Sequence, residues 1–228
     1  MDGRRNVKYG KKLPDNLTNS DNLLQNGFTI VSLFISGCFF LSGAAGLIYE
    51  VLWVRMIEKV IGSAPFSVAA VLSIFMGGLA LGGYLAGKYV DRFQSRNALL
   101  AFYGKIEICV GIYALLLSFL IMAVTPLYRI IYDPLVSHFW CYQAISFLGC
   151  AVLLIVPTCL MGATLPVLCR FYVSRLSHIG GRTGWLYGLN TIGAALGSVM
   201  CGFVLVKNLG VWQSLGIGAA INILYLHS

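Results

Sequence analysis

The chain has 228 residues, of which 58% are hydrophobic and only 11% are charged, and its mean hydropathy is +0.83. So few charges cannot cover the surface of a water-soluble globule of 24.8 kDa. The composition therefore excludes a soluble enzyme, a secreted disulfide scaffold and a disordered chain, and it indicates an integral membrane protein.

The apolar residues fall into six long runs. A membrane-spanning helix needs about 20 mostly apolar residues, because the hydrocarbon core is about 30 Å thick. Six stretches meet this length, although the last one is barely long enough: residues 28–54, 65–89, 98–124, 142–172, 184–206 and 211–226. The sequence therefore predicts an all-α fold, a polytopic integral membrane bundle of six helices over residues 27–228. Residues 1–26 form a polar, basic tail before it.

Several residues indicate where these helices begin, end or bend. Ser63 is a plausible N-cap of the second helix, with Pro65 in its first turn. The third helix is expected to stop before Pro126. The fourth contains Pro157 and Pro166 and is expected to be kinked or broken, since proline removes a helical hydrogen bond.

The basic residues predict the orientation of the bundle. With the first helix entering from the cytoplasm, cytoplasmic segments hold Arg4, Arg5, Lys8, Lys11, Lys12, Lys88, Arg92, Arg96, Arg170, Arg175 and Arg182, and the outer side holds Arg55, Lys59, Arg129 and Lys207. This bias follows the positive-inside rule and predicts a multi-pass protein of the cell inner membrane with both termini in the cytoplasm. Most of the net charge of +8 reflects this distribution of Lys and Arg across the membrane. The lipid bilayer is therefore the expected partner, and nucleic acid is not.

The seven cysteines and three histidines do not form a metal motif. No two cysteines are spaced as C-x-x-C, and no histidine lies near a cysteine in a ligand pattern. Small packing residues inside apolar helices are the simpler interpretation. We therefore expect no metal and no cofactor.

Small residues recur at four-residue intervals in three of the predicted helices. The stripes are Gly78/Gly82/Ala86 and Gly83/Gly87 in the second helix, Gly193/Gly197 and Ala194/Ser198/Gly202 in the fifth, and Ser42/Gly46 in the first. Such stripes let two helix backbones approach closely within lipid. They fit static packing inside one bundle or helices that slide during transport, and the sequence does not separate these two.

Apart from Lys88 and Arg170 at the cytoplasmic ends of their helices, three charged residues lie within the predicted membrane spans. Charges there are costly, so they normally face a partner or a watery cavity. Glu50 lies near the end of the first helix, and Glu107 lies near the middle of the third. They could bind a cation or a substrate amine, or they could pair with Lys105 and Arg55. Lys105 points to nearly the opposite side of its helix from Glu107. Asn190 is a further candidate, although an interhelical hydrogen bond is its simpler role.

The loop between the second and third helices resembles a known motif. Residues 87–96 are similar to the G-x-x-x-D-R-x-x-R-R loop of major facilitator transporters, in the same place and on the same side. Gly87, Asp91, Arg92 and Arg96 match, whereas Ser95 replaces the first of the two terminal basic residues. In that superfamily the loop latches the cytoplasmic gate, so the resemblance implies a gating role for these four residues.

Three further stretches resemble a narrower family. Residues 40–55, 157–166 and 184–197 are similar, in this order, to the membrane part of the bacterial fused facilitator/spermidine-synthase-like proteins. In that family the helices, which are half-facilitator-like, are joined to a soluble aminopropyltransferase-like domain. This sequence contains no strand, glycine-rich loop and helix unit of that kind, so we expect no enzymatic activity from it.

Two functions follow from the resemblance. The first is a membrane anchor or assembly subunit for another protein, for which a separately encoded synthase-like subunit is one candidate. The alternative is a half-size facilitator-type transporter of a small cationic, polyamine-like substrate that works as a dimer. The intramembrane charges favour transport, and the missing second half favours assembly.

Overall fold

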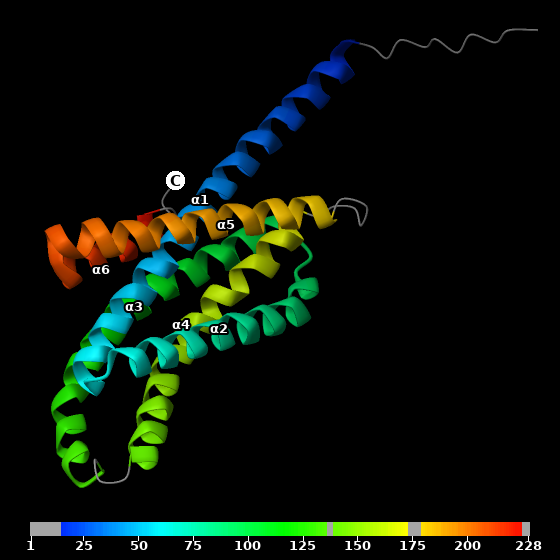
Figure 1. Cartoon of the computed structure of the whole chain (residues 1–228). Helices are drawn as coiled ribbons and strands as arrows, with labels where there is room; N and C mark the ends of the chain where they lie inside the picture. The colour runs from blue at the N-terminus through cyan, green and yellow to red at the C-terminus, as the bar shows by residue number, and fades with distance from the viewer. Residues whose placement is uncertain (1–14, 136–138, 173–178, 225–228) are drawn as a thin grey trace, which may run out of the picture. The chain divides into compact units, whose positions relative to one another are not determined.

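The computed structural model describes residues 15–135, 139–172 and 179–224 (Figure 1). All regular structure in these ranges is helical. The chain divides into two compact units, residues 1–36 and 37–228. The contacts that follow all lie within the second unit.

The elements follow the chain as one helix after another. They are α1 (Asp15–Ile61), α2 (Ala64–Tyr89), the short 3-10 helix η1 (Val90–Arg92), α3 (Arg96–Leu135), α4 (Phe139–Tyr172), α5 (Ile179–Met200), the π-helical turn η3 (Cys201–Leu205) and α6 (Val206–Leu224).

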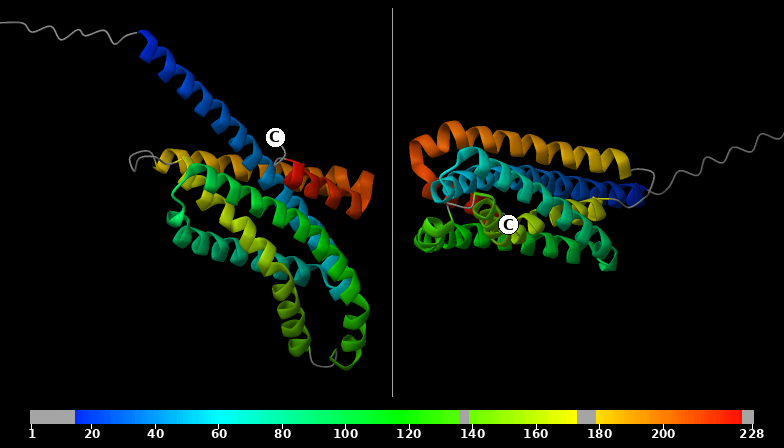
Figure 2. Two further views of the ribbon diagram at one scale, coloured as in Figure 1. Left: turned by 180° about the vertical axis from the view of Figure 1, so that it is seen from behind. Right: turned by 60° about the horizontal axis from the view of Figure 1, so that its bottom comes forward.

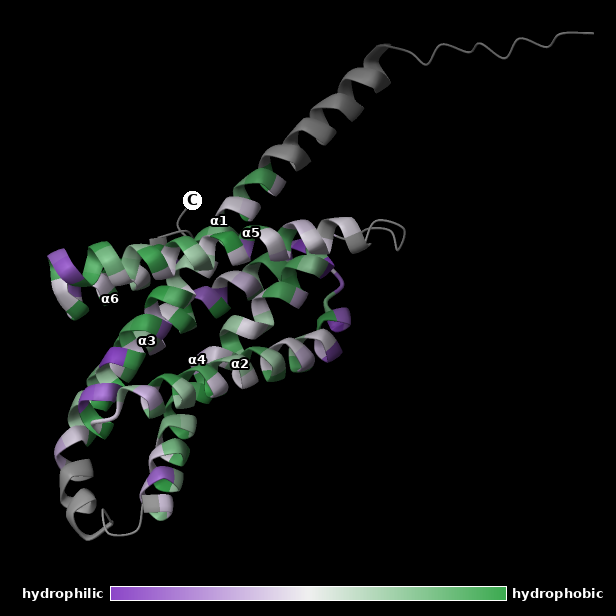
Figure 3. Ribbon diagram, in the orientation of Figure 1, coloured by the Kyte–Doolittle hydropathy of each residue, from purple (hydrophilic) through white to green (hydrophobic). Residues whose placement is uncertain are grey.

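Five helical stretches are long and apolar enough to cross a membrane. They are Val31–Ile61, Ala64–Arg92, Arg96–Pro126, Trp140–Tyr172 and Thr183–Ile223. Figure 3 shows hydrophobic residues along these helices and a hydrophilic group at the η1 end of α2. The prediction of an all-α protein with several apolar, membrane-length helices is therefore confirmed.

The fifth of these stretches reverses direction at Gly210. The φ angle of Gly210 is +80°, in the left-handed region, where glycine carries no steric penalty. The chain turns there, and α6 runs back against the direction of α5 (Figure 2). The two predicted helices, 184–206 and 211–226, thus form one hairpin. At 19 residues including the turn, α6 is short for a membrane span.

Two predicted helix boundaries were wrong. α1 begins at Asp15 rather than near residue 28, so the second half of the predicted tail is helical. α3 continues past Pro126 to Leu135. Once a helix has nucleated, each further residue adds a hydrogen bond, which favours extension beyond the apolar run. Next to Pro126, the Thr125 hydroxyl donates a 2.7 Å hydrogen bond to the Ile121 carbonyl, a common accompaniment of proline in membrane helices.

α4 bends but does not break at its prolines (Figure 1). Because Pro157 has no N–H group, the Leu153 carbonyl loses its helical donor. The Tyr113 hydroxyl on α3 donates to this carbonyl at 3.3 Å. A side chain of the neighbouring helix thus satisfies the backbone group that the proline frees.

Replacing Tyr113 by phenylalanine should therefore destabilise the bundle. Loss of the donor leaves the Leu153 carbonyl without its partner, at a cost of about 1 kcal/mol. Denaturant-induced unfolding in detergent micelles measures the change. Tyr84→Phe is the matched control, because the Tyr84 side chain is exposed and has no described hydrogen bond. Equal stability of the two variants would contradict this role for Tyr113.

Two glycine stripes bring helix pairs into backbone contact. On α5, Gly193 and Gly197 face the backbone of Phe40 and Ala44 on α1. One turn further along, the Cys201 thiol donates to the Ile48 carbonyl at 3.7 Å. No side chain fits between these two helices along this line.

The second close pair is α2 and α4. Gly78 lies against Thr158, Gly82 against the backbone of Cys159, and Gly162 of α4 against the backbone of Leu79. Gly83 makes an ordinary contact with the Gly162 carbonyl, and Gly87 faces open space. The α2 stripe thus packs through its first half and leaves its last glycine without a neighbour.

Candidate functional site

A buried carboxyl group, that of Glu107, forms the centre of the candidate site. Only 5% of its surface is exposed. The Ser42 hydroxyl of α1 donates a 2.6 Å hydrogen bond to Glu107 Oε1. The Tyr103 hydroxyl, one turn earlier on α3, hydrogen-bonds to the same carboxyl group. In the part of the chain that the structure describes, no basic side chain pairs with it.

Further polar groups line the core around Glu107. The Tyr49 hydroxyl of α1 lies within electrostatic range of the Glu107 carboxyl group, and the Tyr49 ring lies against the position of Gly218 on α6. Asn222 is one turn from Gly218 and packs against Gly111, which is one turn from Glu107 on α3. Tyr49 and Asn222 are fully or almost fully buried, and the Tyr49 hydroxyl and the Asn222 amide oxygen have no hydrogen-bond partner among the described residues. Polar atoms thus converge here from three helices.

Glu50 is the second buried carboxyl group. It is 7% exposed, and its Oε2 atom has no hydrogen-bond partner within residues 15–135, 139–172 and 179–224. Ser42, Gly46 and Glu50 share one face of α1 at four-residue intervals, and Gly46 faces Met161 of α4. The backbone of Glu50 is therefore about 12 Å along α1 from that of Ser42, at about 1.5 Å per residue.

The other two predicted binding residues lie elsewhere. Lys105 is exposed and makes no ion pair with Glu50 or Glu107 among the described residues. Asn190 lies on α5 beside Gly43 of α1, close to the α1–α5 contact. The structure thus brings Ser42, Tyr103 and Glu107 together and places Lys105 and Asn190 outside this group.

An enclosed carboxyl group with no counter-charge has two favourable states. It can hold a proton and remain neutral, or it can bind a cation that replaces the lost solvent. The two hydroxyl donors orient the group and leave oxygen lone pairs for a ligand. This arrangement suits exchange between a proton and a cation.

The four residues of the predicted gating motif form an exposed cluster at the η1 end of the bundle. Asp91 of η1 and Arg170 near the end of α4 form an ion pair of 3.2 Å. The Arg92 guanidinium lies over the Tyr89 ring, 4.6 Å from its centroid, and Arg96 begins α3. Both Asp91 and Arg170 are well exposed, so the pair contributes at most about 1 kcal/mol to stability. It ties the loop between α2 and α3 to the end of α4.

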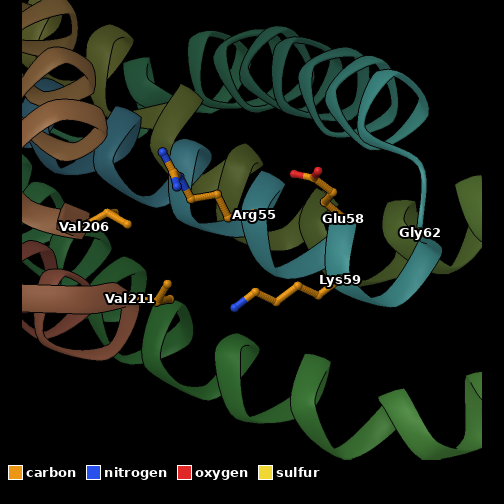
Figure 4. A pocket seen from close by; sticks show the side chains of 6 residues that line it. All are labelled: Arg55, Glu58, Lys59, Gly62, Val206 and Val211. Atoms are coloured by element: carbon orange, nitrogen blue, oxygen red, sulfur yellow. The ribbon is translucent and has the colours of Figure 1, made fainter.

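One pocket was missed by the sequence analysis. Figure 4 shows Arg55, Glu58 and Lys59 on the last turns of α1 beside the α5–α6 turn. Together with Val206 and Val211 they line a cavity of about 390 Å³. The spacing of the charged residues, i, i+3 and i+4, puts them on one helix face and could have predicted the cluster. The contribution of the α5–α6 turn depends on tertiary packing.

The comparisons with known proteins complete the description of the site. No protein-family model, no curated protein and no solved structure matches this chain. The resemblance to the membrane part of the facilitator/spermidine-synthase-like proteins therefore stays a prediction from the sequence motifs.

Proposed function

We propose that the protein is a membrane transport module that binds a small organic cation at Glu107. The observation that carries the proposal is a buried carboxyl group that has two hydroxyl partners and no basic partner in the described chain. The alternative from the sequence was that the buried carboxyl groups form ion pairs with Lys105 or Arg55. No such ion pair is present among the described residues. Intramembrane carboxyl groups of this kind mark ion and substrate pathways.

The position of Glu50 favours a substrate with two positive charges. Glu50 lies two helical turns along α1 from the Ser42 that contacts Glu107, and its Oε2 atom has no hydrogen-bond partner among the described residues. A linear diamine or polyamine carries ammonium groups at separated positions along a flexible chain. Such a cation would place one ammonium group near each carboxyl group, next to Tyr49 and Trp53 on α1. Their rings stack with centroids 5.6 Å apart and add cation–π attraction.

The transport proposal includes an arrangement in the membrane. We place the protein in the cell inner membrane, with six spans and both termini in the cytoplasm, as the distribution of Lys and Arg favours. A half-facilitator-like bundle needs a second lobe to enclose a central path, and we propose that a second copy of the chain supplies it. The gating motif around Asp91 and Arg92 then lies at the cytoplasmic end.

Uptake into proteoliposomes tests this function. The full chain is reconstituted, and the entry of a labelled linear diamine is followed with an outward proton gradient and without one. We expect uptake above that of empty liposomes and faster uptake with the gradient. Uptake equal to that of empty liposomes, in protein that is monodisperse and folded before reconstitution, would refute the proposal.

The anchor function remains a separate prediction, because no described contact points to a partner. It predicts that purification from the native membrane in mild detergent recovers a second protein in a fixed ratio. A synthase-like partner would establish the anchor. Recovery of the chain alone, as a monomer or homodimer, would count against it.

A further inference from the structure

An apolar groove lies between α2 and α4 at the η1 end of the bundle. Its volume is about 510 Å³, within the range of ligand sites in proteins. The lining is almost entirely apolar and includes Leu85 and Tyr89 of α2, Phe93 after η1, Phe102 of α3, and Ile155 and Ala163 of α4. The floor is the close contact of Gly82 with the backbone of Cys159. A long hydrocarbon chain fits this lining, whereas a polar metabolite does not.

The mouth of the groove is basic. Lys88, Arg92, Arg96 and Arg170 lie at this end, and Asp91 is the acidic side chain there. Arg92 is tied to the groove directly, since its guanidinium stacks on the ring of Tyr89, a lining residue. The ion pair of Asp91 with Arg170 holds the loop next to α4. Positive charge is therefore fixed at the opening of an apolar slot.

We propose that this groove is a binding site for one anionic phospholipid. An acyl chain occupies the groove between α2 and α4, and the phosphate group meets the Arg92 guanidinium at the mouth. Guanidinium groups bind phosphate oxygens through charge-assisted, often bidentate hydrogen bonds. Basic side chains next to membrane helices attract anionic lipid headgroups in the same way. The apolar groove retains the acyl chain, and the basic mouth accounts for the preference for a negative headgroup.

The location gives the lipid a role in conformational control. The groove is formed by α2 and α4, whose backbones meet at Gly82, and the loop that joins α2 to α3 lies beside its mouth. A bound lipid fills the space beside this contact. It therefore favours the arrangement of α2 and α4 seen here.

Native mass spectrometry of the full chain in mild detergent tests the site. The protein is offered phosphatidylglycerol or phosphatidylcholine with identical acyl chains. We expect about tenfold more bound phosphatidylglycerol, in a ratio of one per chain, and no displacement by excess inorganic phosphate. Equal binding of the two lipids, or full displacement by inorganic phosphate, would overturn the proposal.

Two pairs of variants separate this site from general charge attraction. Lys88→Gln with Arg92→Gln should abolish the preference for phosphatidylglycerol. The double variant Arg55→Gln with Lys59→Gln removes the same amount of positive charge at the end of α1, far along α2 from the groove mouth. It should preserve the preference for phosphatidylglycerol. Ala163→Leu fills the groove and should lower retention of both lipids at unchanged monodispersity. Equal losses in the two double variants, or full retention of lipid by Ala163→Leu, would contradict the assigned place.

Discussion

Replacing Glu107 by glutamine should abolish transport while leaving the bundle folded. Glutamine keeps the size of the side chain and can still accept a hydrogen bond from Ser42, so packing in the core is preserved. It removes the negative charge that the cation needs. Hydrogen bonds to charged groups contribute about 1.5–3 kcal/mol, so we expect diamine binding to weaken by about 10- to 100-fold. Initial uptake rates in proteoliposomes and equilibrium binding measure the loss.

Lys105→Gln is the matched control for this experiment. It lies two residues away on the same helix, is exposed, and changes the charge by one unit in the opposite direction. Its uptake should equal that of the wild-type protein. If Lys105→Gln lowers uptake as much as Glu107→Gln, the loss is not specific to the buried carboxyl group. Wild-type uptake by Glu107→Gln would exclude Glu107 as the binding group.

Alanine at Gly82 should destabilise the bundle, although alanine is the better helix former. A Cβ atom at Gly82 would meet the backbone of Cys159, with the Cys159 Cα only 2.8 Å away. Backbone cannot move aside as a flexible side chain does, so α2 and α4 must separate. Overpacking of this kind costs about 1–3 kcal/mol, whereas the higher helix propensity of alanine offsets about 1 kcal/mol at most. Denaturation in mixed micelles measures the net loss of unfolding free energy.

For Gly77→Ala on the same helix we expect the opposite effect on stability. No atom lies within 4 Å of a Cβ atom placed at Gly77. The substitution therefore gains helix propensity without a clash and should leave stability unchanged or raise it by up to about 1 kcal/mol. Two Gly→Ala changes, five residues apart, should thus differ in sign. The same sign for both would show that α2 and α4 do not pack through Gly82.

The sequence was sufficient for the helical class and for the approximate positions of the apolar segments. Length and hydrophobicity report how much chain fits within a bilayer, and these are local properties. They did not locate the end of α3, because its helix continues past the apolar stretch and past Pro126. They also separated 184–206 from 211–226 without showing that Gly210 makes the two a hairpin.

The candidate site was predictable only in part. A carboxyl group within an apolar run is visible in the sequence, so Glu50 and Glu107 could be selected. Their environment depends on which helix faces which, and hydropathy carries no such information. Ser42 was selected only as a small packing residue, and Tyr49, Tyr103 and Asn222 are inconspicuous among many aromatic and polar residues. Their convergence results from the packing of α1, α3 and α6.

Equilibrium binding of a labelled linear diamine to the purified wild-type chain tests the transport function most directly. Binding to detergent-solubilised protein needs neither a proton gradient nor a second lobe, so it isolates the role of the buried carboxyl groups. We predict saturable binding of one diamine per chain, with competition by longer polyamines and no competition by neutral diols of the same length. Absence of saturable binding to folded, monodisperse protein would contradict the proposed function.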